Sequence, residues 1–325
     1  MPFPIVSPAF YGEFLESEKI APENEDYCGS FISAAALEYV MYLSEPKVVK
    51  KLIKIKSPLE FKMAYLSEEF EDRVVPLSLE IIEQNPIAEY YWQIRTLMMI
   101  VLQNRTVNFE ERMLLLNYVL KKISAMIAKN QSELIAELAE EFSNIRDYSE
   151  TLEYFKAVYP QVKFSLADGI SLLKSLSKVA DNDFVCIMDD VYQNLKTAPD
   201  ELSRVDMENY MNLRSNYKKI YLGKKQHYIE NIMVNYVWTY SIPFAGGNKL
   251  SIWDNYVFFC SLYNALKVLI SCYMPKKSDD DFAHMIASFD KTLRKVGSDI
   301  IIKVLAAAKK AGQDNNGDLA VLVIS

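Results

Sequence analysis

The sequence is poor in the residues that build loop-rich or metal-binding proteins. It holds 9 glycines and 12 prolines among 325 residues, which argues against a loop-rich β protein and against disorder. It also has only two histidines, His227 and His284, and four scattered cysteines without a CxxC or HExxH spacing. Because zinc sites draw on closely spaced Cys and His ligands, the sequence predicts no metal site.

Nucleotide-binding and nucleophile motifs are missing as well. No GxGxxG or GxxxxGK[ST] occurs, and Gly246-Gly247 follows Pro243 and Phe244 rather than a strand. A nucleophile elbow is absent, although a Ser-His-Asp triad assembles in space and is not excluded by sequence. The first residues lack the basic and apolar segments of a signal peptide, and the scattered cysteines are typical of a reducing compartment. We therefore expect a cytoplasmic protein.

The chain has no basic excess. Its net charge is −7, from 36 basic and 43 acidic residues, so we expect no nucleic-acid partner. The one lysine-rich stretch, KVVKKLIKIK (47–56), alternates lysine with apolar residues at helical spacing. This pattern favours a solvated helix face over contact with an acidic partner. The acidic run 279–281 follows Ser278 at a predicted helix start, which favours helix capping over calcium binding.

Long apolar runs are also scarce, and a single stretch approaches the length of a membrane span. It is WDNYVFFCSLYNALKVLISCYMP (253–275), with Asn264 and Lys267 near its middle. A lysine at the centre of a bilayer is costly, and no second such segment exists to bury its charge. The stretch therefore predicts a central buried helix of a protein outside the membrane.

Helical periodicity dominates the rest of the chain. Helices are predicted over 94–105, 108–129, 132–142, 147–160, 165–180, 184–197, 207–244 with a break near Gly223, 280–297 and 298–312, and only the tail DLAVLVIS is predicted to be extended. The fold class is all-α: a multi-helix globular bundle with a less regular N-terminal region. We place the boundary near QNPIAEYYW, which gives an N-terminal region of residues 1–85 and a helical body of residues 86–325.

The most unusual stretch of the body is HYIENIMVNYVWTYSIPFAGG (227–247). Asn231 and Asn235 are four residues apart and share a helix face among apolar and aromatic neighbours. Buried amides must be hydrogen-bonded, so each amide either clamps the backbone of a neighbouring segment or faces a ligand. The pattern favours the structural clamp.

Several stretches, in order along the chain, resemble the flagellin lysine-N-methylase family. They are PAFYGEF (8–14), EDYCGSF (25–31), LQNRTVNFEERMLLLNYVLKKI (102–123), ENIMVNYVWTYSIPF (230–244), IASFDKTLRKVGSDIIIKVL (286–305) and GDLAVLVIS (317–325). The resemblance implies transfer of methyl groups from S-adenosylmethionine to lysines of flagellin, a protein partner. It also implies an N-terminal cysteine-rich region that binds an iron–sulfur cluster.

The chain departs from the family in that cysteine-rich region. Where the family has paired cysteines this sequence has Cys28-Gly29, the family's tryptophan is Phe31, and a further family cysteine is lost at Ser78-Leu79-Glu80-Ile81. A [4Fe–4S] cluster needs four thiolates, so we expect no cluster within one chain and interpret Cys28 as a remnant ligand. Acidic neighbours also argue against a reactive Cys28 thiolate.

Two interpretations of function stay open, beside the weaker one of a metal shared by two Cys28 thiolates in a dimer. The chain is either a lysine N-methyltransferase with impaired or lost cluster-dependent activity, or a non-catalytic helical module that binds a protein. For the enzyme, the resemblance makes Glu230, Asn231, Asn235 and Tyr236 the candidate catalytic residues. It makes Arg105 and Arg112 candidate binders of a carboxylate or an acidic substrate surface.

Overall fold

The computed structural model describes the helical body and short parts of the N-terminal region. The described residues are 4–8, 30–33, 38–41, 43–58, 61–65, 91–144, 150, 153, 165–197, 207–239, 242 and 251–295. Between residues 91 and 295, every regular element of the described part is a helix. The all-α prediction for the body is therefore confirmed.

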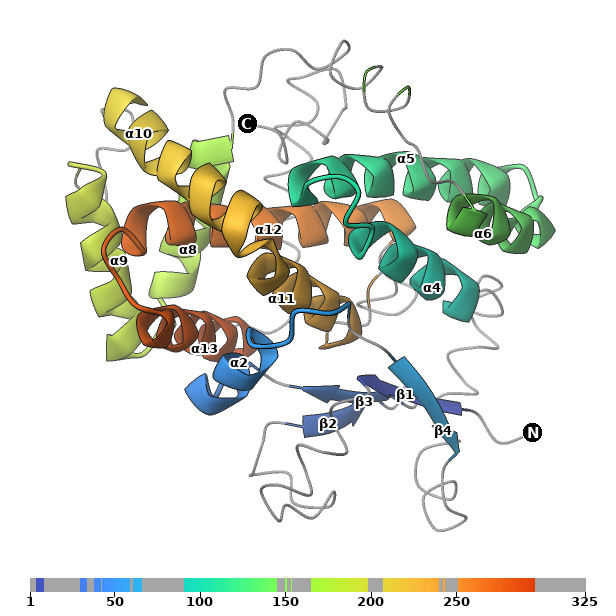
Figure 1. The fold of residues 1–325 in the computed structure, drawn as a ribbon, viewed down its shortest axis with the longest axis horizontal. Helices are drawn as coiled ribbons and strands as arrows, with labels where there is room; N and C mark the ends of the chain where they lie inside the picture. The colour runs from blue at the N-terminus through green and yellow to red at the C-terminus, as the bar shows by residue number, and fades with distance from the viewer. Residues whose placement is uncertain are drawn as a thin grey trace.

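A single helix, α12 (Ile252–Tyr273), forms the centre of the body. Every residue from Asn255 to Tyr273 is buried, and Ser251 caps the helix start in a capping box with Asp254. Figure 1 shows α12 crossing the middle of the molecule, in contact with α5 (Phe109–Ala128), α8 (Ser165–Ser177), α9 (Asn182–Asn194) and α10 (Met207–Tyr217). It is the one described helix long and apolar enough to cross a membrane, and the fold buries all of its apolar 18-residue window. The predicted buried core helix is confirmed.

Gly169 explains how closely α8 approaches α12. A Cβ at this position would lie 2.8 Å from Val268 Cγ2 and 3.3 Å from the backbone oxygen of Asn264. Real Cβ atoms essentially never come within 3.0 Å of a neighbour. Glycine is unfavourable inside a helix, but the close packing of α8 on α12 requires it here.

On one side of the core, α4 (Tyr91–Leu102) packs against α5 and α6 (Ile135–Asn144), which follows the short 3₁₀ helix η2 (Ser132–Leu134). The start of α5 is fixed locally. Asn108 Oδ1 accepts from the Glu111 backbone N–H at 3.1 Å, and Glu111 Oε2 accepts from the Asn108 N–H at 3.0 Å. This capping box satisfies two N–H groups that the helix leaves free, as the Asn cap and acidic first turn predict.

The long predicted helix over 207–244 consists of three parts. α10 is followed by a π-helical segment, η4 (Lys218–Lys224), a bend at Lys225, and α11 (Gln226–Thr239). Tyr221 of η4 is buried, stacked on Phe282 with ring centroids 5.5 Å apart. The sequence placed the break near Gly223, and the structure has it at Lys225.

The N-terminal region meets the body through α2 (Pro46–Leu52), which packs against α13 (Asp279–Lys295) and also touches α11. Two antiparallel strand pairs lie below it (Figure 1): β1 (Pro4–Pro8) with β4 (Phe61–Tyr65), and β2 (Ser30–Ser33) with β3 (Glu38–Met41). The sequence analysis did not predict these strands, which form the less regular part of the fold. The helices predicted over 147–160 and 298–312 and the extended tail fall outside the described residues.

Candidate functional site

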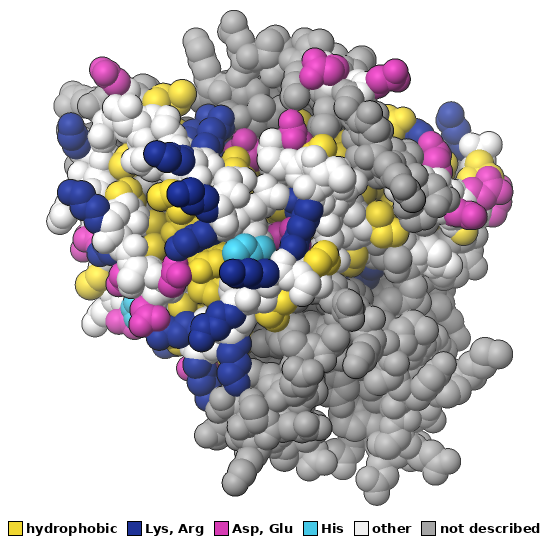
Figure 2. Space-filling model, viewed as in Figure 1, with side chains coloured by type: hydrophobic (Ala, Val, Ile, Leu, Met, Phe, Trp, Pro, Cys, Tyr) yellow, Lys and Arg dark blue, Asp and Glu magenta, His cyan; other side chains and the backbone are white. Residues whose placement is uncertain are grey.

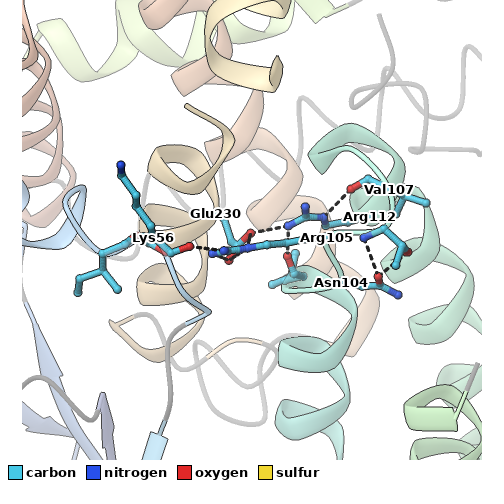
Figure 3. A network of polar contacts seen from close by, with 10 residues as sticks. Lys56, Asn104, Arg105, Val107, Arg112 and Glu230 are labelled. Atoms are coloured by element: carbon cyan, nitrogen blue, oxygen red, sulfur yellow. Dashed lines mark hydrogen bonds and ion pairs between the residues drawn. The ribbon is translucent and has the colours of Figure 1, made fainter. Parts of the chain in front are cut away.

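The centre of the candidate site is Glu230, a fully buried carboxylate on α11. Arg105 donates hydrogen bonds to it from two nitrogens: Nη2 lies 2.6 Å from Oε1, and Nε lies 3.0 Å from Oε2. Arg112 Nη1 donates to Oε2 from the other side at 2.6 Å. Figure 3 shows the carboxylate between the two guanidinium groups, which come from the α4–α5 turn and from α5.

Arg112 is the buried half of this network. Its side chain has no exposed surface, and it also donates to the backbone oxygens of Leu102 at 2.9 Å and Val107 at 3.0 Å. Burial lowers the pKa of Arg112, while the hydrogen bond and charge of Glu230 act in the opposite direction. A buried guanidinium needs a partner for each donor, so Glu230 and the two carbonyls are what make its burial tolerable.

Arg105 extends the network to the N-terminal region. A third of its side-chain surface is exposed, and besides Glu230 it donates from Nη1 to the backbone oxygen of Lys56 (Figure 3). The cluster therefore joins three segments that are far apart in the sequence: the chain after α2, the α4–α5 turn and α11. We call Glu230, Arg105 and Arg112 the carboxylate clamp.

Asn231, the next residue on α11, holds α2 from the same side. Its Nδ2 donates to the backbone oxygens of Leu52 at 2.8 Å and Ile55 at 2.9 Å. These carbonyls lie at and just beyond the end of α2, where helix carbonyls have no partner within the helix. Of the two roles that the sequence left open for Asn231, the structure shows the backbone clamp.

Asn235 and Tyr236 continue the buried surface of α11. Their exposed fractions are 1% and 0%, so the predicted burial of this stretch is confirmed. Both arginines bind a carboxylate, as their chemistry predicts, but that carboxylate is the chain's own Glu230. The structure gives the clamp residues and Asn231 an internal structural role, and a catalytic or substrate-binding role for the six candidates stays a prediction.

A second buried cluster of charges lies in the core, and the sequence analysis did not propose it as a site. Lys267 on α12 is fully buried, with Nζ 3.9 Å from Oε1 of Glu110 on α5, and Arg214 Nη2 of α10 lies 3.8 Å from the same oxygen. Burial lowers the pKa of Lys267 to about 7, with Glu110 acting against the shift. The sequence feature that could have pointed to this cluster is Lys267 itself, a lysine in the most apolar run of the chain.

Two tyrosines belong to the same cluster. The hydroxyls of Tyr217 and Tyr263 lie 3.0 Å apart in the core, and burial raises both pKa values. Lys267 Nζ lies 5.8 Å from the centre of the Tyr263 ring. Ionisable groups with strongly shifted pKa values gather at functional sites but also in structural networks, so the shifts alone assign no function to this cluster.

The cysteines of the body do not form a ligand set. Cys186 is exposed on α9, whereas Cys260 and Cys272 are buried on α12, where burial raises the pKa of Cys260 to about 12 and also raises that of Cys272. Within the described ranges, no group of three or more His, Cys, Asp or Glu side chains could hold a metal. Cys28 and its neighbours lie outside those ranges.

The acidic run at the start of α13 has structural partners. Ser278 and Asp281 form reciprocal bonds, with the Asp281 N–H donating to Ser278 Oγ at 3.2 Å and the Ser278 N–H to Asp281 Oδ2 at 2.7 Å. Asp279 pairs with Lys225, and Asp280 pairs with Lys50 at 2.9 Å. These contacts agree with the helix-capping interpretation of the run.

Comparison with known proteins gives one match. A family model described as the FliB lysine N-methylase C-terminal domain matches residues 95–322, which is more than half of the chain and includes the carboxylate clamp. No curated protein and no solved structure matches.

Proposed function

Because the chain belongs to the FliB lysine N-methylase family, we propose that it acts on lysine side chains of a flagellin-type protein, as a cytoplasmic N-methylase that uses S-adenosylmethionine. The match over residues 95–322 carries this proposal, since it takes in all the described helices from α5 to α13. The matched part is also the part whose packing is centred on α12. The family chemistry would therefore belong to the helical body.

We further propose that activity dependent on an iron–sulfur cluster is impaired or lost in this chain. The pair Cys28-Gly29 supports this, because it offers one thiolate where the resemblance implies two. The three described cysteines support it too, since they lie on α9 and in the buried core and cannot converge with one another. The body would have to act without a cluster.

The Glu230 carboxylate and the amide nitrogen of Asn231 are not free to bind S-adenosylmethionine. A donor of this kind needs side chains that can still bind its hydroxyl, amino and carboxylate groups. Both oxygens of Glu230 already accept from guanidinium nitrogens, and the amide nitrogen of Asn231 already donates to two carbonyls. No step of methyl transfer is therefore assigned to these two groups.

That disagreement favours a second candidate function, a non-catalytic helical module that binds a flagellin-type protein. The observation in its favour is the saturation of the Glu230 carboxylate by two arginines of the same chain. A clamp of this kind holds a binding surface in shape without taking part in chemistry. The two functions differ in whether the chain binds the donor and transfers a methyl group.

Three measurements on the purified, metal-free protein separate them. The first is calorimetric titration with S-adenosylmethionine, the second is fluorescence anisotropy of a labelled flagellin subunit, and the third is mass spectrometry of a flagellin subunit incubated with the protein and the donor. Saturable donor binding together with lysine methylation supports the enzyme. Flagellin binding without donor binding or methylation supports the binding module, and the absence of all three overturns both.

The same titration shows whether the clamp belongs to a donor site. Glu230→Ala and Asn231→Ala would abolish donor binding if these residues touch the donor, and the exposed Glu141→Gln on α6 serves as the control. Circular dichroism must accompany each variant, because Glu230 also holds the fold together. Donor binding that survives in a folded Asn231→Ala protein would remove this residue from the candidates.

A further inference from the structure

Lysine and arginine side chains gather on one part of the surface of this acidic protein (Figure 2). Figure 2 shows Lys and Arg side chains gathered over η4, the start of α11 and α2, with apolar side chains between them. Six residues define what we call the basic face: Lys54, Lys56, Arg105, Lys219, Lys224 and His227. The chain as a whole has a net charge of −7, so this gathering runs against its overall charge.

Contacts around His227 bring the two halves of the basic face together. The His227 ring hydrogen-bonds the backbone of Ile53, at the end of α2, and Arg105 donates to the backbone oxygen of Lys56. Burial is the main cause that lowers the pKa of His227, and the charges of Arg105 and Lys56 lower it further. These cations are therefore close enough to act on one imidazole.

Four lysines of the basic face are available to a partner. Lys54, Lys56, Lys219 and Lys224 are exposed, and they form no ion pair with the part of the chain that the structure describes. Their neighbours Lys50 and Lys225, by contrast, pair with the carboxylates at the start of α13. Asp279 and Asp280 are thus paired with Lys225 and Lys50, and no described carboxylate pairs with the four lysines of the basic face.

The π-helical turn of η4 shapes this surface. In a π-helix residues i and i+5 are one hydrogen-bonded turn apart, which sets Lys219 and Lys224 side by side. Between them in sequence lies Ile220, which is 39% exposed, and Leu222 and Ile55 are partly buried against the core. π-helical turns often mark functional positions, and an exposed apolar side chain within a charged rim is typical of a protein interface.

We propose that the basic face binds an acidic segment of the protein substrate, with an apolar side chain of that segment placed on Ile220. Charge complementarity supports this partner, and the apolar centre favours a protein over a nucleic acid, whose binding domains are usually basic as a whole. The inference rests on the proposed function in taking the segment to belong to a flagellin-type protein. It requires no methyl transfer.

The test compares variants that remove two charges each. Fluorescence anisotropy of the full chain is measured with two probes: a labelled flagellin subunit, and a synthetic amphipathic helical peptide with glutamates on either side of a leucine stripe. The face variants are Lys219→Gln/Lys224→Gln and Lys54→Gln/Lys56→Gln. The control is Lys129→Gln/Lys178→Gln, two exposed lysines in the turns that follow α5 and α8, with the same change of charge.

We expect each face variant to weaken binding on the order of fivefold at low salt, and the control to have little effect. Added salt should weaken wild-type binding and reduce these differences. Equal effects of face and control variants on flagellin binding would overturn the basic face and leave the proposed function standing.

The other outcomes are equally decisive. Face-dependent binding of the peptide without any flagellin binding would support the basic face and count against a flagellin-type substrate. No binding of either probe would overturn the inference. An oligonucleotide or an anionic vesicle that binds more tightly than the peptide, through the same lysines, would overturn the choice of a protein partner.

Discussion

Glu230→Gln should destabilise the protein strongly, because Glu230 is the one Asp, Glu, Lys or Arg of α11 and is fully buried. The substitution keeps the shape of the side chain but removes its charge. Arg112, whose side chain has no exposed surface, then lacks a carboxylate partner. Breaking a buried pair in this way costs about 3–5 kcal/mol, because the remaining charge is uncompensated. The amide oxygen can still accept one hydrogen bond, so we expect about 3 kcal/mol, a large share of the ~5–15 kcal/mol that stabilises most domains.

The assay is equilibrium unfolding in urea, followed by circular dichroism, with the midpoint compared at equal slope. Arg105→Gln is the graded comparison: Arg105 is one-third exposed and its loss leaves Arg112 on Glu230, so we expect only about 1.5 kcal/mol, the low end for a hydrogen bond to a charged group. Glu141→Gln, a change of one exposed carboxylate on α6, is the matched control. If Glu230→Gln is no more destabilising than Glu141→Gln, the clamp does not hold the fold together.

Three further perturbations test the packing and the buried charges. Gly169→Ala places a Cβ 2.8 Å from Val268 Cγ2, so we expect urea unfolding to show a loss of about 1–3 kcal/mol in the free energy of unfolding. In Gly223→Ala the Cβ meets nothing closer than 3.8 Å, so this control should not be destabilised. Equal losses in the two variants would contradict the close packing of α8 on α12. The folded state releases the Lys267 proton near pH 7 and the unfolded state near 10.5, so wild-type stability should rise relative to Lys267→Met between pH 7.5 and 9, and a constant difference would refute the shift. Asn231→Ala removes the side-chain donor to the carbonyls of Leu52 and Ile55, which should cost about 1–3 kcal/mol and speed amide exchange in α2. Unchanged exchange would show that Asn231 does not hold the end of α2.

Local signals in the sequence were enough for the helices of the body. Asn108 and Glu111 predict the start of α5 within four residues, and the capping box that they form involves only residues close in sequence. The apolar run around Lys267 predicted a buried helix, because hydrophobicity on all sides of a helix has no other outcome in a protein of this composition. Both predictions depend on short stretches whose behaviour does not need the rest of the chain.

The carboxylate clamp was beyond such reasoning. Glu230 and Arg112 are 118 residues apart, and nothing in either local pattern names the other as a partner. The family resemblance made the arginines candidate binders of a carboxylate or acidic surface of the substrate, which stays a prediction, and it did not identify Glu230 as their partner. The π-helical segment η4 was not predicted for a related reason. Its buried Tyr221 packs on Phe282 of α13, a contact between segments far apart in the sequence.

The position of α12 along the chain has a consequence for biosynthesis. Its contacts are with α5, α8, α9 and α10, all of which leave the ribosome earlier. Until residue 273 has been made, these four helices have no common surface on which to bury their apolar faces. The body is therefore expected to acquire its tertiary structure late in translation, with the apolar faces of the earlier helices exposed in the interval. A chain that stops before α12 would leave those helices with nothing to fold around.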